Sequence, residues 1–89
     1  MSSTLHIFSK PKSYYTAFDM NLVGIHDKIL LQQDACYDQS QFASNSPVQI
    51  YMLETCAIAR AVTPIDSIQQ VDDLSWVDLI ANCDKSITW

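Results

Sequence analysis

The sequence predicts an α/β protein with a mainly parallel sheet of about five strands. Short runs rich in apolar and β-branched residues alternate with segments of helical periodicity, and turn-forming residues separate them. Two of the runs, residues 28–33 and 48–53, contain uninterrupted apolar stretches at 29–31 and 50–53, which is typical of strands covered by helices on both faces. Strands that alternate with helices of this length favour βαβ units with right-handed crossovers.

The first strand is predicted over residues 4–9. It ends before Pro11, which cannot donate a hydrogen bond to a neighbouring strand. Ser13 is placed to cap a helix over residues 14–23, in which aromatic and aliphatic residues recur at helical spacing. Gly24, the single glycine of the chain, is predicted to end that helix in a left-handed conformation.

The second strand, residues 28–33, is the apolar run that ends in a polar turn. Asp34 is expected to cap a short helical stretch that reaches Phe42, and residues 44–47 have the composition of a loop. The third strand is predicted over residues 48–53. Because ligand sites in α/β sheets gather beyond the carboxyl ends of the strands, the turn after the second strand is the first place to look for a site.

The remaining elements complete the alternation. A helix is predicted over residues 54–62 and ends at a Thr-Pro pair, and a short fourth strand covers residues 67–71. Either Asp72 or Asp73 caps the helix that follows. Residues 85–89 form a short closing strand, so the whole chain, residues 1–89, is a single domain.

Composition narrows the classes of function. Hydrophobic residues make up 48% of the chain and charged residues 17%, which is too apolar for disorder and indicates surface that contacts a partner. The net charge is −5 and the five basic residues are scattered, so direct contact with nucleic acid is not expected. No apolar run of membrane-spanning length and no leader segment is present, which favours a cytoplasmic protein without membrane contact.

The three cysteines, Cys36, Cys56 and Cys83, lack the close pairing of a zinc site or a redox motif. The sequence also contains no Ser-His-Asp order and no phosphate-binding loop. We therefore expect no metal or other cofactor and no independent hydrolytic activity.

Four segments together resemble the sulfur-relay TusB/DsrH family. They are a Leu-His strand at residues 5–10, the Gln-Asp-x-x-Tyr turn within residues 29–37, an Ala-Arg pair in a helix over residues 53–62, and a tryptophan at the end of residues 87–89. The resemblance covers nearly the whole chain. It implies a DsrE/F/H-like three-layer αβα sandwich.

The resemblance also implies a function and partners. Such a subunit belongs to a hetero-hexamer with two related DsrE/F-like subunits, in which persulfide sulfur passes from an upstream carrier to a downstream carrier. The usual end use is 2-thiolation of the tRNA wobble uridine, and related complexes serve dissimilatory sulfur oxidation. Family members from sulfur oxidisers can carry a cysteine in the first helix. Residues 14–23 contain none, which places this chain nearer the tRNA-thiolation branch.

Two positions depart from the family pattern. Alanine stands where the family has glycine in the Asp34-Ala35 and Arg60-Ala61 pairs. If the backbone is left-handed at either position, alanine costs roughly 1 kcal/mol there relative to glycine.

The candidate site residues are few. Cys36 is the candidate persulfide thiol, because a helix N-terminus lowers a cysteine pKa, but the favoured interpretation is that it fills an apolar position. Cys56, in the first turn of a predicted helix, is either a thiolate stabilised by the helix dipole or, as we favour, a tolerated surface or half-buried thiol. Asp34, Tyr37 and Trp89 are the candidate partner contacts, with Trp89 expected to have few neighbours within the chain. His6 is interpreted as a core or interface histidine rather than a base.

The leading hypothesis is a subunit that assembles or shapes a sulfur-relay complex without carrying sulfur. The alternatives are a persulfide carrier that uses Cys36, a subunit serving sulfur oxidation, and a regulatory binding module that has kept the fold alone.

Overall fold

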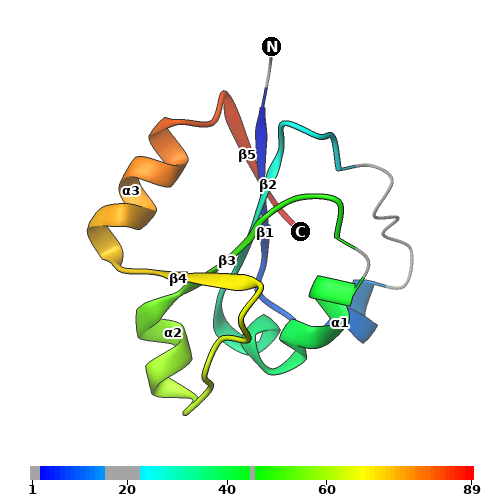
Figure 1. Cartoon of the computed structure of the whole chain (residues 1–89), viewed down its shortest axis with the longest axis vertical. Helices are drawn as coiled ribbons and strands as arrows, with labels where there is room; N and C mark the ends of the chain where they lie inside the picture. The colour runs from blue at the N-terminus through cyan, green and yellow to red at the C-terminus, as the bar shows by residue number, and fades with distance from the viewer. Residues whose placement is uncertain (1–2, 16–22, 45) are drawn as a thin grey trace.

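The computed structural model describes residues 3–15, 23–44 and 46–89. Its centre is a five-stranded sheet in which all pairings are parallel, in the order β4-β3-β2-β1-β5 (Figure 1). The strands are β1 (Thr4–Phe8), β2 (Lys28–Leu31), β3 (Ile50–Leu53), β4 (Ile68–Val71) and β5 (Lys85–Thr88). The predicted parallel α/β architecture is confirmed.

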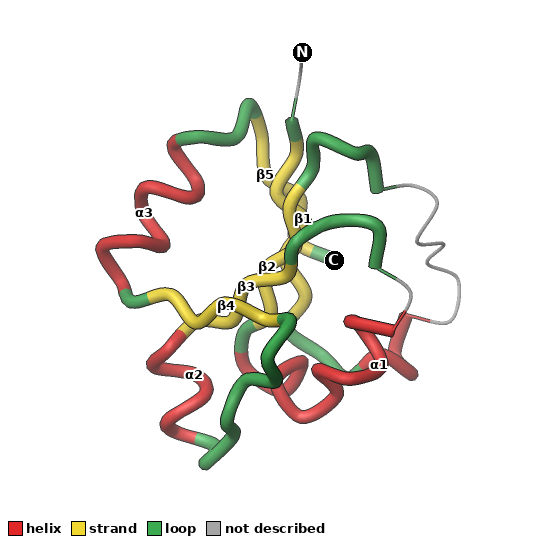
Figure 2. Tube along the Cα trace, in the orientation of Figure 1, coloured by secondary structure: helices red, strands yellow, loops and turns green. Residues whose placement is uncertain are grey.

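Helices lie on both sides of this sheet, with α1 and α3 on opposite sides (Figures 1 and 2). The described helices are the 3-10 helices η1 (Lys12–Tyr15) and η3 (Gln33–Asp38) and the α-helices α1 (Gln39–Ser44), α2 (Glu54–Ala59) and α3 (Asp73–Ala81). None of the helices in the described ranges is long and apolar enough to cross a membrane.

Two apolar cores arise from the alternation of side chains along the strands. In β1, Phe8 belongs to the first core, while Leu5 and Ile7 belong to the second. The first core lies under η1, η3, α1 and α2, which contribute residues such as Tyr15, Cys36, Phe42 and Ala57, and the second is closed by Leu79 of α3. The chain is therefore a three-layer αβα sandwich.

The central strands are buried as their composition predicts. Ile29, Leu30 and Leu31 of β2 are fully buried, and three of the four residues of β3 are buried. The edge strand β5 is largely exposed by contrast. The strands are shorter than predicted, because regular pairing begins at Ile50 in β3 and ends at Leu31 in β2.

The structure tests the predicted cap of α3 and the predicted conformation of Gly24. Most of the helix predicted over residues 14–23 lies outside the described residues. Asp72 caps α3, since its carboxylate accepts a hydrogen bond from the Ser75 backbone N–H at 2.8 Å. The left-handed conformation predicted for Gly24 is wrong: its φ is not positive, and its N–H donates to the Asp27 carboxylate at 2.9 Å instead. Residues 16–22 of the predicted first helix lie outside the described residues, and its start is the 3-10 helix η1.

Candidate functional site

The residues predicted to form a site follow β2 and β5. Because all strands are parallel, their carboxyl ends meet at one edge of the sheet, so Asp34, Cys36 and Tyr37 of η3 lie at the same edge as Trp89 after β5. The pairing of β1 with β2 extends beyond the strands: the Gln32 N–H donates to Phe8 O at 2.9 Å and the Asp34 N–H to Ser9 O at 3.1 Å.

Asp34 does not cap a helix, contrary to the prediction. The helical turn begins two residues earlier than expected, with Gln32 at the N-cap position and Gln33 in a left-handed backbone conformation, φ 50°. This places Asp34 inside η3, where its carboxylate accepts a hydrogen bond from Arg60 Nε at 3.2 Å. Arg60 Nη1 also lies 3.4 Å from the Cys56 carbonyl oxygen. The pair is half-exposed and joins the turn after β2 to the end of α2.

Cys36 is fully buried among the side chains of the first core. Burial raises the pKa of the thiol to about 11, the proximity of Cys56 adds to the increase, and Arg60 opposes it. The expectation that a helix N-terminus lowers the pKa of Cys36 is therefore wrong. Desolvation of the thiol outweighs the effect of one short 3-10 helix. Cys36 has the properties of a core residue.

The other candidate residues differ in exposure. Cys56 and Cys83 are half-buried free cysteines, and the Tyr37 side chain is 59% exposed. Tyr37 thus presents an aromatic ring to solvent at the carboxyl edge of the sheet. An exposed tyrosine of this kind is a common contact residue in protein interfaces.

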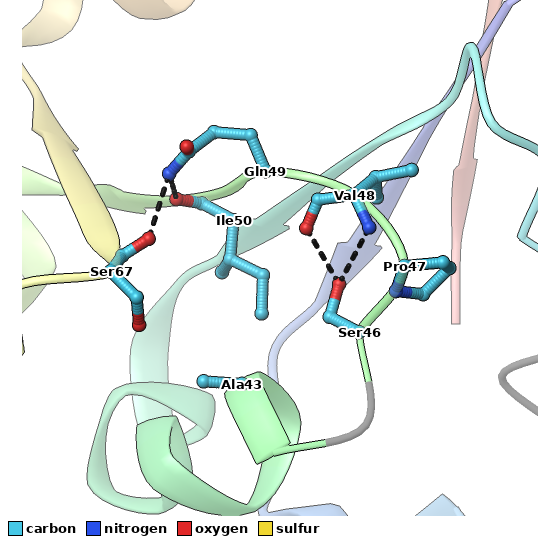
Figure 3. A pocket seen from close by; sticks show the side chains of 7 residues that line it. All are labelled: Ala43, Ser46, Pro47, Val48, Gln49, Ile50 and Ser67. Carbon is cyan, nitrogen blue, oxygen red and sulfur yellow. Dashed lines mark hydrogen bonds between the residues drawn. The ribbon is translucent and has the colours of Figure 1, made fainter.

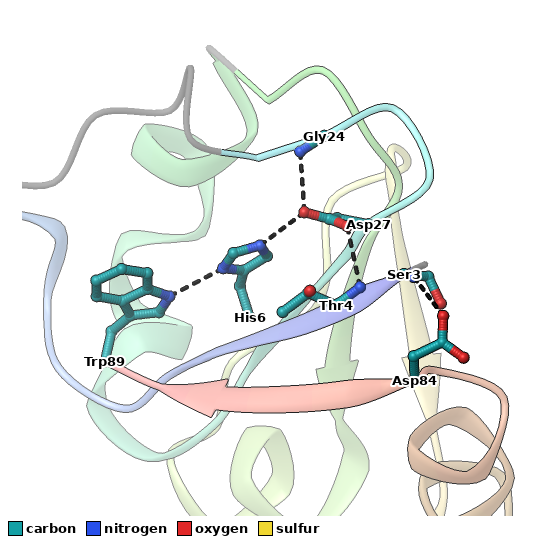
Figure 4. Close-up of polar contacts among 7 residues, drawn as sticks. All are labelled: Ser3, Thr4, His6, Gly24, Asp27, Asp84 and Trp89. Atoms are coloured by element: carbon teal, nitrogen blue, oxygen red, sulfur yellow. Dashed lines mark hydrogen bonds and ion pairs between the residues drawn. The ribbon is translucent and has the colours of Figure 1, made fainter. Parts of the chain in front are cut away.

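Trp89 has more neighbours within the chain than predicted. Its indole Nε1–H donates to His6 Nδ1 at 3.0 Å (Figure 4). Its ring also stacks with the Phe8 ring at a centroid distance of 6.4 Å. Its backbone N–H donates to Ile7 O at 2.9 Å, and its carbonyl oxygen accepts from the Tyr15 hydroxyl at 3.1 Å. The residue as a whole is still 37% exposed, so part of Trp89 is available to a partner.

His6 links Trp89 to Asp27, which the sequence did not single out. His6 Nε2 lies 2.9 Å from Asp27 Oδ2, and the same carboxylate accepts from the backbone N–H groups of Thr4 and Gly24, both at 2.9 Å (Figure 4). An indole N–H can only donate, so His6 Nδ1 must be the acceptor. The proton of the neutral imidazole is therefore on Nε2, facing Asp27, and His6 is a satisfied buried histidine as predicted.

The environment of Asp27 favours its ionised form. Burial raises the pKa of this carboxyl, but the hydrogen bonds from His6, Gly24 and Thr4 outweigh that effect and lower the pKa below its usual value. The only sequence signal for this role is an acid just before a buried strand. That signal is weak, because two of the three donors to Asp27 come from β1, far away in the sequence, and the third comes from the turn just before β2.

Two surface hollows accompany these features. One of about 290 Å³ lies beside the amino end of β3 (Figure 3). There the Ser46 hydroxyl donates to the Val48 carbonyl oxygen and accepts from the Val48 N–H, and Gln49 Nε2 donates to the carbonyl oxygens of Ile50 and Ser67. The other, of about 340 Å³, lies between η1 and the helices after β2; beside it the Lys12 N–H donates to Asp38 at 2.8 Å. Neither contains the predicted site residues. In the described ranges no cluster of His, Cys, Asp and Glu side chains could hold a metal ion.

An all-parallel sheet of this strand order, with helices on both faces, defines a three-layer α/β protein. The structure superimposes on the crystal structure of the YchN protein from E. coli with a TM-score of 0.71 over 100% of both chains. Their sequences are 14% identical, so the likeness is one of fold. No family model and no curated protein sequence matches this chain.

Proposed function

We propose that this chain is a TusB/DsrH-like, non-catalytic subunit of a sulfur-relay complex, whose role is to assemble or shape the partner that carries the persulfide. The observation that carries the proposal is the DsrE-like fold over the full length of the chain, on which the TusB/DsrH-like segments fall in their expected order. The assembly is proposed to be a hetero-hexamer with two related DsrE/F-like subunits in the cytoplasm.

The state of Cys36 supports a structural role over a carrier role. A thiol must be ionised to attack a persulfide, and it must be reached by the donor. Cys36 has no exposed surface, and its pKa of about 11 leaves about one thiol in 10,000 ionised at pH 7. The first helix region, residues 14–23, contains no cysteine that could replace it.

The proposed end use is 2-thiolation of the tRNA wobble uridine. The net charge of −5 suits a subunit that passes sulfur on through partners and does not itself hold tRNA. Partner contact is proposed at the carboxyl edge of the sheet, where Tyr37 is exposed and Asp34 and Trp89 are partly exposed. The upstream and downstream sulfur carriers would then meet the complex through the subunit that holds the thiol.

Co-expression with its two related subunits tests the proposal. We expect native mass spectrometry to show a hetero-hexamer, and loading with a persulfide donor to add about 32 Da to a partner and not to this chain. A chain that stays monomeric with both subunits present would contradict the proposal. A cell lacking the chain should lose 2-thiouridine from its tRNA; loss of sulfur oxidation alone would assign it to the dissimilatory pathway instead.

A thiol-free variant provides the matched control. Cys36→Ala, Cys56→Ser and Cys83→Ser combined remove every cysteine of the chain. If the chain only assembles the complex, the variant complex transfers sulfur at the wild-type rate once its hexamer has been confirmed. An intact hexamer that no longer transfers sulfur would show that this chain is a carrier, and single substitutions would then identify the thiol.

A further inference from the structure

Helix α3 is apolar on two faces. Six of its nine residues are apolar, and they divide between a side that packs on the sheet and a side that faces solvent. Leu79 is buried in the second core, with Trp76 and Ile80 packed against it. On the opposite side Leu74 is 80% exposed and Val77 58% exposed. A surface helix normally shows polar residues there, so the exposed apolar side requires an explanation.

The exposed side forms a continuous stripe, which we name the outer face of α3: Leu74, Val77, Asp78 and Ala81. Their spacing of three, four and seven residues from Leu74 places them on one side of the helix. All four are exposed. This is the spacing at which an amphipathic helix presents its anchors to a groove on another protein.

The negative charge of the chain is concentrated in the sequence segment that contains this face. Residues 61–84 hold five acids and no basic residue, while the rest of the chain holds five of each and is formally neutral. The acids are Asp66, Asp72, Asp73, Asp78 and Asp84. The net charge of −5 is thus that of the segment that includes β4 and α3.

Three of these acids, Asp66, Asp73 and Asp78, accept no hydrogen bond in the described part of the chain, and of the two on α3 only Asp73, in the first turn, is placed where the helix dipole favours a negative charge. Asp72 caps α3, and Asp84 accepts a hydrogen bond from the Ser3 N–H at 2.8 Å. No described side chain or backbone group donates to the exposed carboxylates of Asp73 and Asp78. Asp78 also lies near the carboxyl end of α3, where the helix dipole disfavours negative charge. Its charge therefore does not stabilise the helix on which it stands.

We propose that the outer face of α3 docks a partner protein whose contact surface is an apolar groove flanked by lysine or arginine side chains. Leu74 and Val77 enter the groove, and Asp73 and Asp78 pair with its basic rim. Charge complementarity selects this occupant. A second copy of this chain would place two acidic faces against each other, and the phosphates of nucleic acid or of an anionic membrane would be repelled. The inference does not depend on the sulfur-relay function.

A synthetic helical peptide of leucine and lysine, with leucines along one side, provides the probe, and the same peptide with glutamate for lysine is its control. We expect the lysine peptide to shift NMR resonances of α3 in the ¹⁵N-labelled full chain, with an affinity that falls as salt rises. The glutamate peptide should cause no shifts. Lysine-peptide shifts centred away from α3 would overturn the proposal.

Paired variants separate the outer face from net charge. Asp73→Lys/Asp78→Lys is expected to weaken peptide binding at least tenfold, and so is Leu74→Ser. Glu54→Lys/Asp66→Lys changes the net charge by the same amount elsewhere, and Ile58→Ser removes an exposed apolar residue from α2; both should retain most of the affinity. If both charge reversals weakened peptide binding equally, binding would depend on the net charge of the chain and not on the outer face of α3, and the proposal would be overturned.

Thermal unfolding and sedimentation complete the test. Asp78→Lys places a cation near the carboxyl end of α3, so its melting temperature should equal or exceed that of the wild type while its peptide affinity falls. Loss of affinity accompanied by loss of the fold would contradict this expectation. Self-association of the wild-type chain that Leu74→Ser abolishes would assign the face to a second copy and reject the basic partner.

Discussion

The indole N–H groups of the two tryptophans differ in whether they make a hydrogen bond. Trp89 Nε1 donates to His6 Nδ1 at 3.0 Å, whereas Trp76 Nε1 is buried without a hydrogen-bond partner among the described residues. Replacing Trp89 by phenylalanine keeps a ring but leaves His6 Nδ1 without its donor. We expect Trp89→Phe to lower the free energy of unfolding by about 1 kcal/mol, measured by urea denaturation.

Trp76→Phe is the matched control for that substitution. The smaller phenylalanine ring buries less apolar area, which lowers the free energy of unfolding. It also removes a buried N–H that has no hydrogen-bond acceptor, which raises the free energy of unfolding, so the two effects oppose each other. We expect a change smaller than that of Trp89→Phe, or a gain in stability. If Trp76→Phe proved the more destabilising of the two, the His6–Trp89 hydrogen bond would stabilise the fold less than the packing of the Trp76 ring does.

Cys36 should be the least reactive of the three thiols. It is fully buried, and burial raises its pKa to about 11, while Cys56 and Cys83 are half-buried. We expect iodoacetamide to label Cys56 and Cys83 first in the native protein, and Cys36 only at the rate of unfolding. Mass mapping of labelled peptides over time, with urea-unfolded protein as the reference, measures the order. Early labelling of Cys36 would revive its role as a carrier.

At the scale of elements, two turns contain residues with unfavourable backbone conformations. Gln33 starts η3 with φ 50°, and Ala61 follows α2 with φ 54°. Neither residue is glycine, so each has the Cβ crowding that disfavours the left-handed region. We expect Gln33→Gly and Ala61→Gly each to raise the free energy of unfolding by up to about 1 kcal/mol, measured by urea denaturation.

Ala59→Gly controls for the greater flexibility of glycine in the unfolded chain. Ala59 is the last residue of α2 and is not in a left-handed conformation, so glycine there should destabilise by up to about 1 kcal/mol. Opposite signs for the Ala61 and Ala59 variants are the expected outcome. Equal destabilisation would mean that the left-handed backbone of Ala61 costs little.

The resemblance noted in the sequence identified one of these left-handed positions correctly and the other wrongly. Alanine at position 61 was expected to matter if the backbone were left-handed, and it is. In the turn after β2 the suspected position was Ala35, yet the left-handed residue is Gln33. Gly24, the residue most suited to that conformation, does not adopt it. A residue type permits a backbone conformation, but the hydrogen bonds of the surrounding turn decide whether it occurs.

At the scale of the whole molecule, the sheet was predictable and the polar network was not. Apolar runs separated by helical segments indicate buried parallel strands, because that information is local to each segment. The Asp27–His6–Trp89 network joins residues 21 and 83 positions apart. No local pattern encodes such a contact. The high hydrophobic content of the chain predicts an interface, and α3 is the described helix with the most apolar side chains exposed to solvent.

Asp27 ties the start of β1 to the turn before β2, so its titration should contribute to the acid stability of the whole domain. Its pKa is lowered in the folded state, because hydrogen bonds from His6, Gly24 and Thr4 outweigh the effect of burial. The stability from the ionised carboxylate is therefore present above pH 3.8, the usual carboxyl value, and is lost as the pH falls through the lower folded-state pKa.

The variant Asp27→Asn keeps the size of the side chain but turns an amide NH2 toward at least one of the three donors. At neutral pH we expect it to lower the free energy of unfolding by about 1–3 kcal/mol. Because asparagine does not titrate, the gap between wild type and variant should narrow as the pH falls below 3.8, measured by urea denaturation at each pH. Asp72→Asn is the control, since asparagine caps a helix about as well as aspartate and the loss there should be smaller at neutral pH. A difference in free energy of unfolding between wild type and Asp27→Asn that stays constant with pH would contradict this prediction. It would show that the hydrogen bonds of Asp27 join β1 to the turn before β2 equally well whether or not the carboxyl is ionised.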